Sequence, residues 1–86
     1  MTIVFHKDVK KQFQKLPIDE RDRFKQRLRI FREDLYDAVL YNHPLHGKYA
    51  GCRSINVAGD LRAIYKFVKK ETVVFIAIGT HGNLYS

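Results

Sequence analysis

Apolar residues in the first part of the chain recur at the spacing of helices. One set repeats at i, i+4 and i+7 before Pro17, which predicts an amphipathic helix that ends at this proline. A second set repeats over residues 19–33, where Asp19 is the expected N-cap. The apolar positions of the two helices are Val9, Phe13 and Leu16, and then Phe24, Leu28, Phe31 and Leu35. The connection is short, so the helices are predicted to form an αα-hairpin.

Strand-like runs precede and follow this helical hairpin. The runs are Thr2–Phe5 and residues 49–57, 61–68 and 72–78. The connections at Ala58-Gly59 and at residues 69–71 are short, so the last three strands are predicted to pair antiparallel in chain order. Because TVVFIAI at residues 72–78 is apolar on both faces, we expect it to be the central strand, covered on both sides.

The order of these elements predicts the fold class. A β-α-α-β-β-β chain of this kind forms an α+β fold, with the helical hairpin packed on one face of a mostly antiparallel, twisted sheet. The other face of the sheet is then open for function. The chain has 86 residues, which suffice for a single domain over residues 1–86. Residues 34–48 have no regular pattern and are expected to be an irregular connection.

The charge of the chain narrows the choice of partners. Sixteen Lys and Arg residues against nine Asp and Glu give a formal net charge of +7. A small domain this basic binds phosphate groups, an acidic protein, or both. The second helix is expected to carry one basic face, which either contacts such a partner or is simply solvated. Its basic residues are Arg21, Arg23, Lys25, Arg27, Arg29 and Arg32.

Other features of the sequence predict a cytoplasmic protein without a membrane partner. The longest apolar runs are far shorter than the ~20 residues that a membrane span needs. The N-terminus, MTIVFHKD, lacks the basic start, apolar stretch and cleavage site of a signal peptide. Cys52 is the single cysteine and therefore forms no internal disulfide, in agreement with a reducing compartment.

Polar residues with catalytic chemistry gather around the predicted strand ends. Strand alternation and the hairpin turn bring Asn56 close to Asp60 and Arg62, and His81 directly follows the last strand. Phosphodiester cleavage needs a base, an acid and a fixed cation, which carboxylate, imidazole and guanidinium groups supply without a cofactor. His43 is a further candidate acid or base.

The same residues could also have ordinary structural roles. Asp60 after a glycine is common turn chemistry, and it is an obvious ion-pair partner for Arg62. A zinc site would require two close-spaced ligand pairs, whereas the chain has only the pair His43 and His46, with Cys52 and His81 as further ligands. We therefore expect no metal.

Taken together, these motifs resemble the RelE/ParE superfamily of bacterial toxin–antitoxin modules, and within it the YafQ-like branch. The similarity covers residues 43–85, half of the chain, and its motifs follow one another with the family's order and gaps. They are HPLHG at residues 43–47, GCR at 51–53, VAGD at 57–60, IY at 64–65 and GTHGNLY at 79–85.

The resemblance implies a toxin that cuts mRNA in the ribosomal A site and is neutralised by a cognate antitoxin, with a toxin–antitoxin heterotetramer as one form of the assembly. It implies that His81 is a general acid or base, that Asp60 is a base or orienting group, and that His43 is the first histidine of the branch. Arg62 would grip the scissile phosphate, and Tyr85 would position the mRNA. RNA contacts are expected from Lys48, Arg53, Asn56, Arg23 and Arg27.

The chain departs from the YafQ-like pattern at two positions. Asn56 stands where that branch has a second histidine, and Leu61 stands where an aromatic residue follows the acid. Asparagine cannot shuttle a proton, although it can form hydrogen bonds with a phosphate or hydroxyl group. Two alternatives therefore stay open: a ParE-like inhibitor of DNA gyrase, and an impaired toxin that acts only through its antitoxin.

Overall fold

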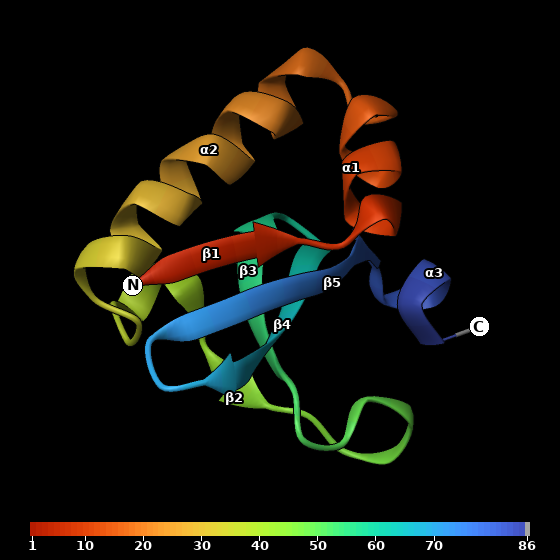
Figure 1. Cartoon of the computed structure of the whole chain (residues 1–86). Helices are drawn as coiled ribbons and strands as arrows, with labels where there is room; N and C mark the ends of the chain where they lie inside the picture. The colour runs from red at the N-terminus through yellow and green to blue at the C-terminus, as the bar shows by residue number, and fades with distance from the viewer. Residues whose placement is uncertain (86) are drawn as a thin grey trace.

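Five strands and three helices make up the part of the chain that the computed structural model describes, residues 1–85 (Figure 1). The sheet has the order β1-β5-β4-β3-β2; β1 pairs parallel with β5, and every other pair is antiparallel. Helices α1 and α2 cover one face, so the predicted α+β fold is confirmed (Figure 1). The elements are β1 (Thr2–Phe5), α1 (Lys7–Gln14), α2 (Ile18–Glu33), β2 (His43–Pro44), β3 (Arg53–Ala58), β4 (Leu61–Lys69), β5 (Thr72–Thr80) and α3 (His81–Tyr85), with 3₁₀ turns η1 (Ala38–Leu40) and η2 (Gly47–Tyr49).

The main core lies between the helices and the sheet. Phe24 and Phe31 of α2 are almost fully buried, as the helical spacing predicts. The Phe75 ring of β5 packs against both of them and against Tyr65 of β4, with centroids 5.4–5.9 Å apart. These aromatic contacts fix α2 over β4 and β5.

Helix α2 starts differently from the prediction. It begins at Ile18, and its N-cap is Pro17, which makes no side-chain capping hydrogen bond. The extended backbone of Pro17 starts the helix, and its carbonyl accepts a hydrogen bond from the Arg21 amide at 3.0 Å. The expected N-cap at Asp19 is therefore wrong, and this carboxylate lies in the first turn, where it favours the positive end of the helix dipole.

The strand predicted over residues 49–57 begins four residues late. Gly47 and Gly51 have positive φ angles of 62° and 88°, so the chain turns twice before β3 starts at Arg53. The short edge strand β2, which pairs His43 with Ser54, was not predicted. Two residues are too few for an alternating pattern to be visible in a sequence.

The predicted central strand is an interior strand, but it is not the middle one. β5 lies between β1 and β4, and β4 is the middle strand. On the side away from α1 and α2, only the second half of β5 is covered, where Ala77 packs in a small cluster with Ile64, Cys52 and Leu84. Coverage on both sides is therefore confirmed for this half only, because α3 is too short to reach further.

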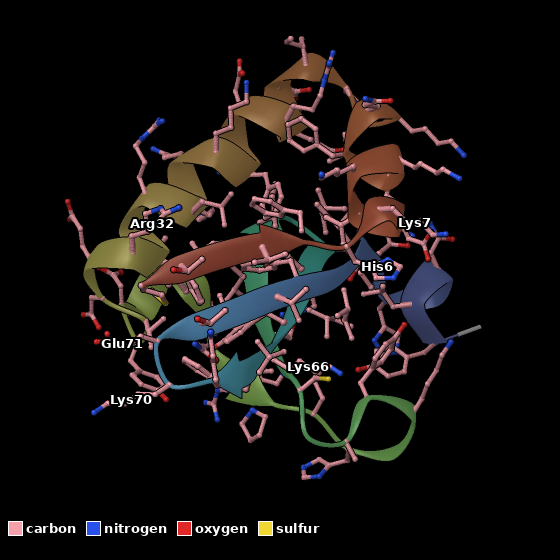
Figure 2. All side chains as sticks on the ribbon, in the orientation of Figure 1. His6, Lys7, Arg32, Lys66, Lys70 and Glu71 are labelled. Carbon is pink, nitrogen blue, oxygen red and sulfur yellow. The ribbon has the colours of Figure 1, made fainter. Side chains whose placement is uncertain are left out.

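The basic residues of α2 do not share one face, which corrects the prediction. An α-helix turns by about 100° per residue, so alternate basic positions are distributed over both flanks of the apolar stripe. On one flank, Lys25 lies 6.0 Å from the centre of the Phe13 ring, and Arg32 donates a hydrogen bond to the Met1 carbonyl (Figure 2). Arg23 lies on the other flank, toward the turn between β3 and β4.

Within residues 1–85, no helix has the length and apolar character that crossing a bilayer requires.

Candidate functional site

Strand pairing brings several predicted site residues to the sheet face that α1 and α2 leave uncovered, here called the open face. Directly paired residues point to the same side of a sheet. His43 pairs with Ser54, Ser54 with Ile64, and Asn56 with Arg62. Ile64 belongs to the small cluster under α3, so all of these side chains share the open face. Along the strand direction, His43 lies about 7 Å from the Asn56–Arg62 pair. This distance follows because its partner Ser54 is two residues before Asn56, and a strand rises about 3.3 Å per residue.

Arg62 is the cation at the centre of this face. It is half-buried between Asn56 on β3 and Gly79 on β5, and its Nη1 atom is buried with no hydrogen-bond partner in residues 1–85. Desolvation of a guanidinium nitrogen without a partner is costly. The Nε atoms of Arg21 and Arg27 are also buried without a partner, but both belong to α2, whereas Arg62 lies on the open face. The remaining N–H groups suit two oxygens of one phosphate.

Asn56 and Asp60 belong to the turn between β3 and β4. The Asn56 Nδ2 atom donates a hydrogen bond to the Gly59 carbonyl at 2.9 Å, and Gly59 has a φ of 51°. Asn56 therefore stabilises the turn that carries the exposed Asp60. Because Leu61 pairs with Thr80, this turn lies beside the end of β5, next to His81.

A hollow of about 690 Å³ lies behind this turn, between the α1–α2 connection and the ends of β3, β4 and β5. Asp60 and Thr80 line one side, and Lys15 and Arg23 line the other. Of the α2 residues predicted to contact RNA, Arg23 therefore lies near the predicted catalytic carboxylate. Arg27, one turn further along α2, is half-buried.

His43 is exposed, but its ring is fixed. The Nδ1 atom lies 2.8 Å from the Tyr41 carbonyl oxygen. A carbonyl can only accept a hydrogen bond, so Nδ1 carries the proton, and in the neutral ring the lone pair is on Nε2. This tautomer presents a proton acceptor on the far side of the ring.

The second histidine stands on the single turn of α3. Leu84 anchors this turn by packing in the small cluster, while His81 and Tyr85 stay exposed. The rings of His81 and Tyr85 are 4.8 Å apart and tilted by 32°, and Tyr49 packs edge-on against Tyr85 at 5.4 Å. The sequence prediction did not include Tyr49, although its position just after the HPLHG motif was a possible signal.

Lys48 and Arg53 make contacts inside the protein. The Lys48 Nζ atom donates a hydrogen bond to the Leu84 carbonyl at 3.2 Å and so ties η2 to α3. Arg53 pairs with Tyr65 and points to the helix side, where its Nε atom donates to the Asn42 side chain at 2.7 Å. The structure thus does not bring Arg53 together with the residues of the open face.

Asn42 and Tyr65 form a polar network that the sequence analysis missed. Their side chains meet 23 residues apart in the chain, at 2.7 Å between Asn42 Nδ2 and the Tyr65 hydroxyl. Nothing in the local pattern marks such a contact.

Across residues 1–85, no three His, Cys, Asp or Glu side chains come close enough together to hold a metal ion.

Comparisons with known proteins identify the family. The family model described as the bacterial toxin of type II toxin–antitoxin systems, YafQ, matches residues 1–86. No curated protein sequence matches the chain. YafQ from E. coli strain BL21(DE3) has a TM-score of 0.72 and 24% identity, and covers 98% of this chain and 97% of its own.

Other solved toxins share the fold. The YoeB/ParE toxin from Agrobacterium tumefaciens has a TM-score of 0.78 at 16% identity, over 94% of this chain and 99% of that toxin. The archaeal RelE–RelB complex from Pyrococcus horikoshii OT3 gives 0.76 at 23% identity, over 94% of each chain. These structures show that the chain has the fold of the YoeB/ParE and RelE toxins. The predicted resemblance to the YafQ-like branch is confirmed by the family model, and the chain belongs to the YafQ family of toxins of type II toxin–antitoxin systems.

Proposed function

We propose that this toxin is a ribosome-dependent mRNA endoribonuclease that cuts mRNA in the A site. The observation that carries the proposal is the buried, unpartnered Nη1 atom of Arg62, on a face that also bears His43 and borders His81. A guanidinium held in this way is arranged to receive phosphate oxygens and the charge that develops on them. Histidines near such a cation supply the proton transfers of phosphodiester cleavage.

The reaction assigned to this site needs no metal ion. The substrate's 2′-hydroxyl oxygen attacks the adjacent phosphorus, and its proton goes to Nε2 of His43 or to the Asp60 carboxylate. The bond from phosphorus to the 5′-oxygen breaks, and His81 gives that oxygen a proton. Arg62 stabilises the added negative charge on the phosphoryl oxygens. The products carry a 2′,3′-cyclic phosphate, or a 3′-phosphate after hydrolysis, and a 5′-hydroxyl.

Tyr85 supplies a stacking surface next to His81. Its ring contacts the edge-on ring of Tyr49 and the ring of His81. RNA bases next to a cleavage site are unstacked and pack on aromatic side chains of this kind. This contact would fix the nucleotide whose 5′-oxygen His81 protonates.

A cognate antitoxin is the proposed protein partner. Similar structures include the E. coli DinJ–YafQ complex, the archaeal RelE–RelB complex and the YoeB–YefM complex from Staphylococcus aureus. The net charge of +7 favours both an acidic antitoxin and ribosomal RNA. A toxin–antitoxin heterotetramer in the cytoplasm is the assembly that we propose.

The test is mRNA cleavage in a reconstituted translation mixture, followed by primer extension, with the His81→Ala variant as comparison. We expect cuts within reading frames that require ribosomes, and a loss of about 10²–10⁴-fold in rate in the variant, as for removal of a general acid. End-labelling of the fragments checks the chemistry. Fragments with 5′-phosphate ends would contradict attack by the 2′-hydroxyl.

A second candidate function rests on Asn56. This side chain takes the place of a histidine in the YafQ-like pattern and is engaged with the Gly59 carbonyl, so it contributes no proton transfer. A toxin without ribonuclease activity would then act on DNA gyrase or only bind its antitoxin. Inhibition of gyrase supercoiling by micromolar toxin, without any mRNA cleavage, would favour this alternative.

A further inference from the structure

The segment that carries His43 has an unusual backbone at Tyr41. Tyr41 has φ and ψ angles of 46° each, in the left-handed region that is strained for a non-glycine residue. Its side chain is 74% exposed, so contacts of the ring do not hold this conformation. The conformation is maintained by the Tyr41 amide, which donates to the Ala38 carbonyl at 3.2 Å, and by the residues on either side.

Both neighbours of Tyr41 are anchored. Leu40 is completely buried in the main core. The Asn42 amide donates to the Leu35 carbonyl at 2.8 Å and to the Tyr65 hydroxyl at 2.7 Å, and its Oδ1 atom accepts from Arg53 at 2.7 Å. A carbonyl only accepts and a guanidinium only donates, so these partners allow one orientation of the amide.

Arg53 and Tyr65 are themselves held in place. Tyr65 is fully buried, in contact with Phe31 and Phe75. The Arg53 guanidinium lies 5.4 Å from the centre of the Tyr36 ring. The Asn42 side chain thus joins the His43 segment to β3, to β4 and to the end of α2.

The consequence falls on the His43 ring. The strained Tyr41 residue directs its carbonyl oxygen toward Nδ1 of His43, at 2.8 Å. β2 has only two residues, and His43 is exposed, so the strand alone does not fix the ring. We infer that Asn42, held by Tyr65 and Arg53, is a positioning residue that keeps the Tyr41 carbonyl on Nδ1 of His43 and thereby leaves Nε2 as the proton acceptor. This inference rests on the proposed function for its catalytic meaning, but the tautomer is a property of the free protein.

The first experiment measures the tautomer without RNA. Nitrogen NMR of the free toxin, at a pH at which His43 is neutral, distinguishes a protonated Nδ1 from a protonated Nε2. We expect wild type to have the proton on Nδ1, and Asn42→Ala to shift the population toward Nε2. Tyr65→Phe removes one acceptor of the amide with little change of volume, and we expect a smaller shift in the same direction.

Tyr41→Gly is the matched control. Glycine adopts the left-handed conformation without strain and retains the backbone carbonyl, so we expect the His43 tautomer to stay as in wild type. A wild-type ring protonated on Nε2 would overturn the inference. So would an unchanged tautomer in both Asn42→Ala and Tyr65→Phe, provided that both variants retain the wild-type amide spectrum away from the segment.

The second experiment measures cleavage. In Asn42→Ala we expect kcat to fall by about 10–100-fold with KM for programmed ribosomes unchanged, because only the orientation of the base is lost. A fall in binding instead of kcat would overturn the positioning role. If wild type shows the expected tautomer, Asn42→Ala shifts it and wild type cuts no mRNA, the proposed function fails while control of the tautomer by Asn42 is confirmed.

Discussion

The face of the sheet under α1 and α2 and the open face differ in what fills them. Under the helices, four strands contribute to one large cluster in which Phe31, Tyr65 and Phe75 have no exposed surface. The open face has a cluster of only four buried residues, none of them aromatic, beside the polar side chains of Asn56 and Arg62. Stability is therefore concentrated on one face, which leaves the other free to carry partly buried polar groups whose desolvation is costly.

This comparison predicts that changes on the two faces have separable effects. Changes under the helices should lower the free energy of unfolding, whereas changes to the polar groups of the open face should lower cleavage at constant stability. The turn between β4 and β5, which Lys70 marks in Figure 2, lies at the far end of the sheet from α3. Phe67, near this turn, supplies the control for stability, and Lys70, in the turn, supplies the control for cleavage.

The largest effect on stability is expected for Phe31→Ala. Loss of a completely buried ring costs about 3–5 kcal/mol, a large share of the 5–15 kcal/mol typical of small domains. Phe67→Ala makes the same change at a side chain that is 46% exposed, and should cost about 1 kcal/mol or less. Urea unfolding measures both values. Equal costs would show that the helix-covered face is no more important for stability than the strand ends.

Among changes to the open face, Arg62→Ala is expected to have the largest effect on mRNA cleavage. Removal of one donor that stabilises developing charge lowers kcat by about 10²–10³-fold, whereas the free energy of unfolding should stay within about 1 kcal/mol of wild type. Arg62→Lys keeps the charge but loses the fork and should restore little activity. Lys70→Ala removes an exposed cation in the turn after β4, outside the open face, so it is the control and should cleave mRNA normally. Full activity of Arg62→Ala would remove Arg62 from the mechanism.

An effect of intermediate size on the free energy of unfolding is expected at high pH, and Tyr65 causes it. Burial raises the pKa of Tyr65 above its ordinary value of 10.0, and hydrogen bonds with Asn42 and Arg53 offset part of this rise. The unfolded chain then releases this proton before the folded chain does. The contribution to stability is complete below pH 10 and is lost as the pH rises through the folded pKa, by at most about 1.4 kcal/mol per pH unit.

Two variants isolate this contribution. In Tyr65→Phe the decline in the free energy of unfolding above pH 10 should be less steep than in wild type. Tyr41→Phe changes an exposed tyrosine and should leave the decline as it is. Urea midpoints measured from neutral pH to pH 11 give the comparison, and identical slopes for wild type and Tyr65→Phe would contradict it.

The smallest effect is expected for Ser54→Ala. Ser54 is 1% exposed, and its hydroxyl has no hydrogen-bond partner in residues 1–85. Removal of such a buried oxygen should leave the free energy of unfolding unchanged or raise it by up to about 1 kcal/mol, without effect on cleavage. A loss of cleavage at unchanged stability would instead add Ser54 to the residues that act on RNA.

The motifs of the sequence predicted that several candidate site residues lie together, but not the contacts that support them. His43, Arg62 and Asn56 were expected near one another, and strand pairing brings them to one face. The partners of Arg53 could not be predicted, because Asn42 and Tyr36 lie outside β3 and reach Arg53 only in the folded chain. Alternation along a strand predicts which side chains share a face. Which of the two faces the helices cover is decided by the packing of the whole sheet.

The sequence by itself determined helices α1 and α2, the three long strands and the family of the chain, whereas the predicted C-terminal tail forms helix α3. These follow from periodic apolar side chains and from motifs of a few residues, which are local properties. Only the tertiary structure decided the parallel pairing of β1 with β5, the edge strand β2 and the network around Asn42. The side chains of this network come together from positions 11 and 23 residues apart, and such contacts form only when the core closes around them.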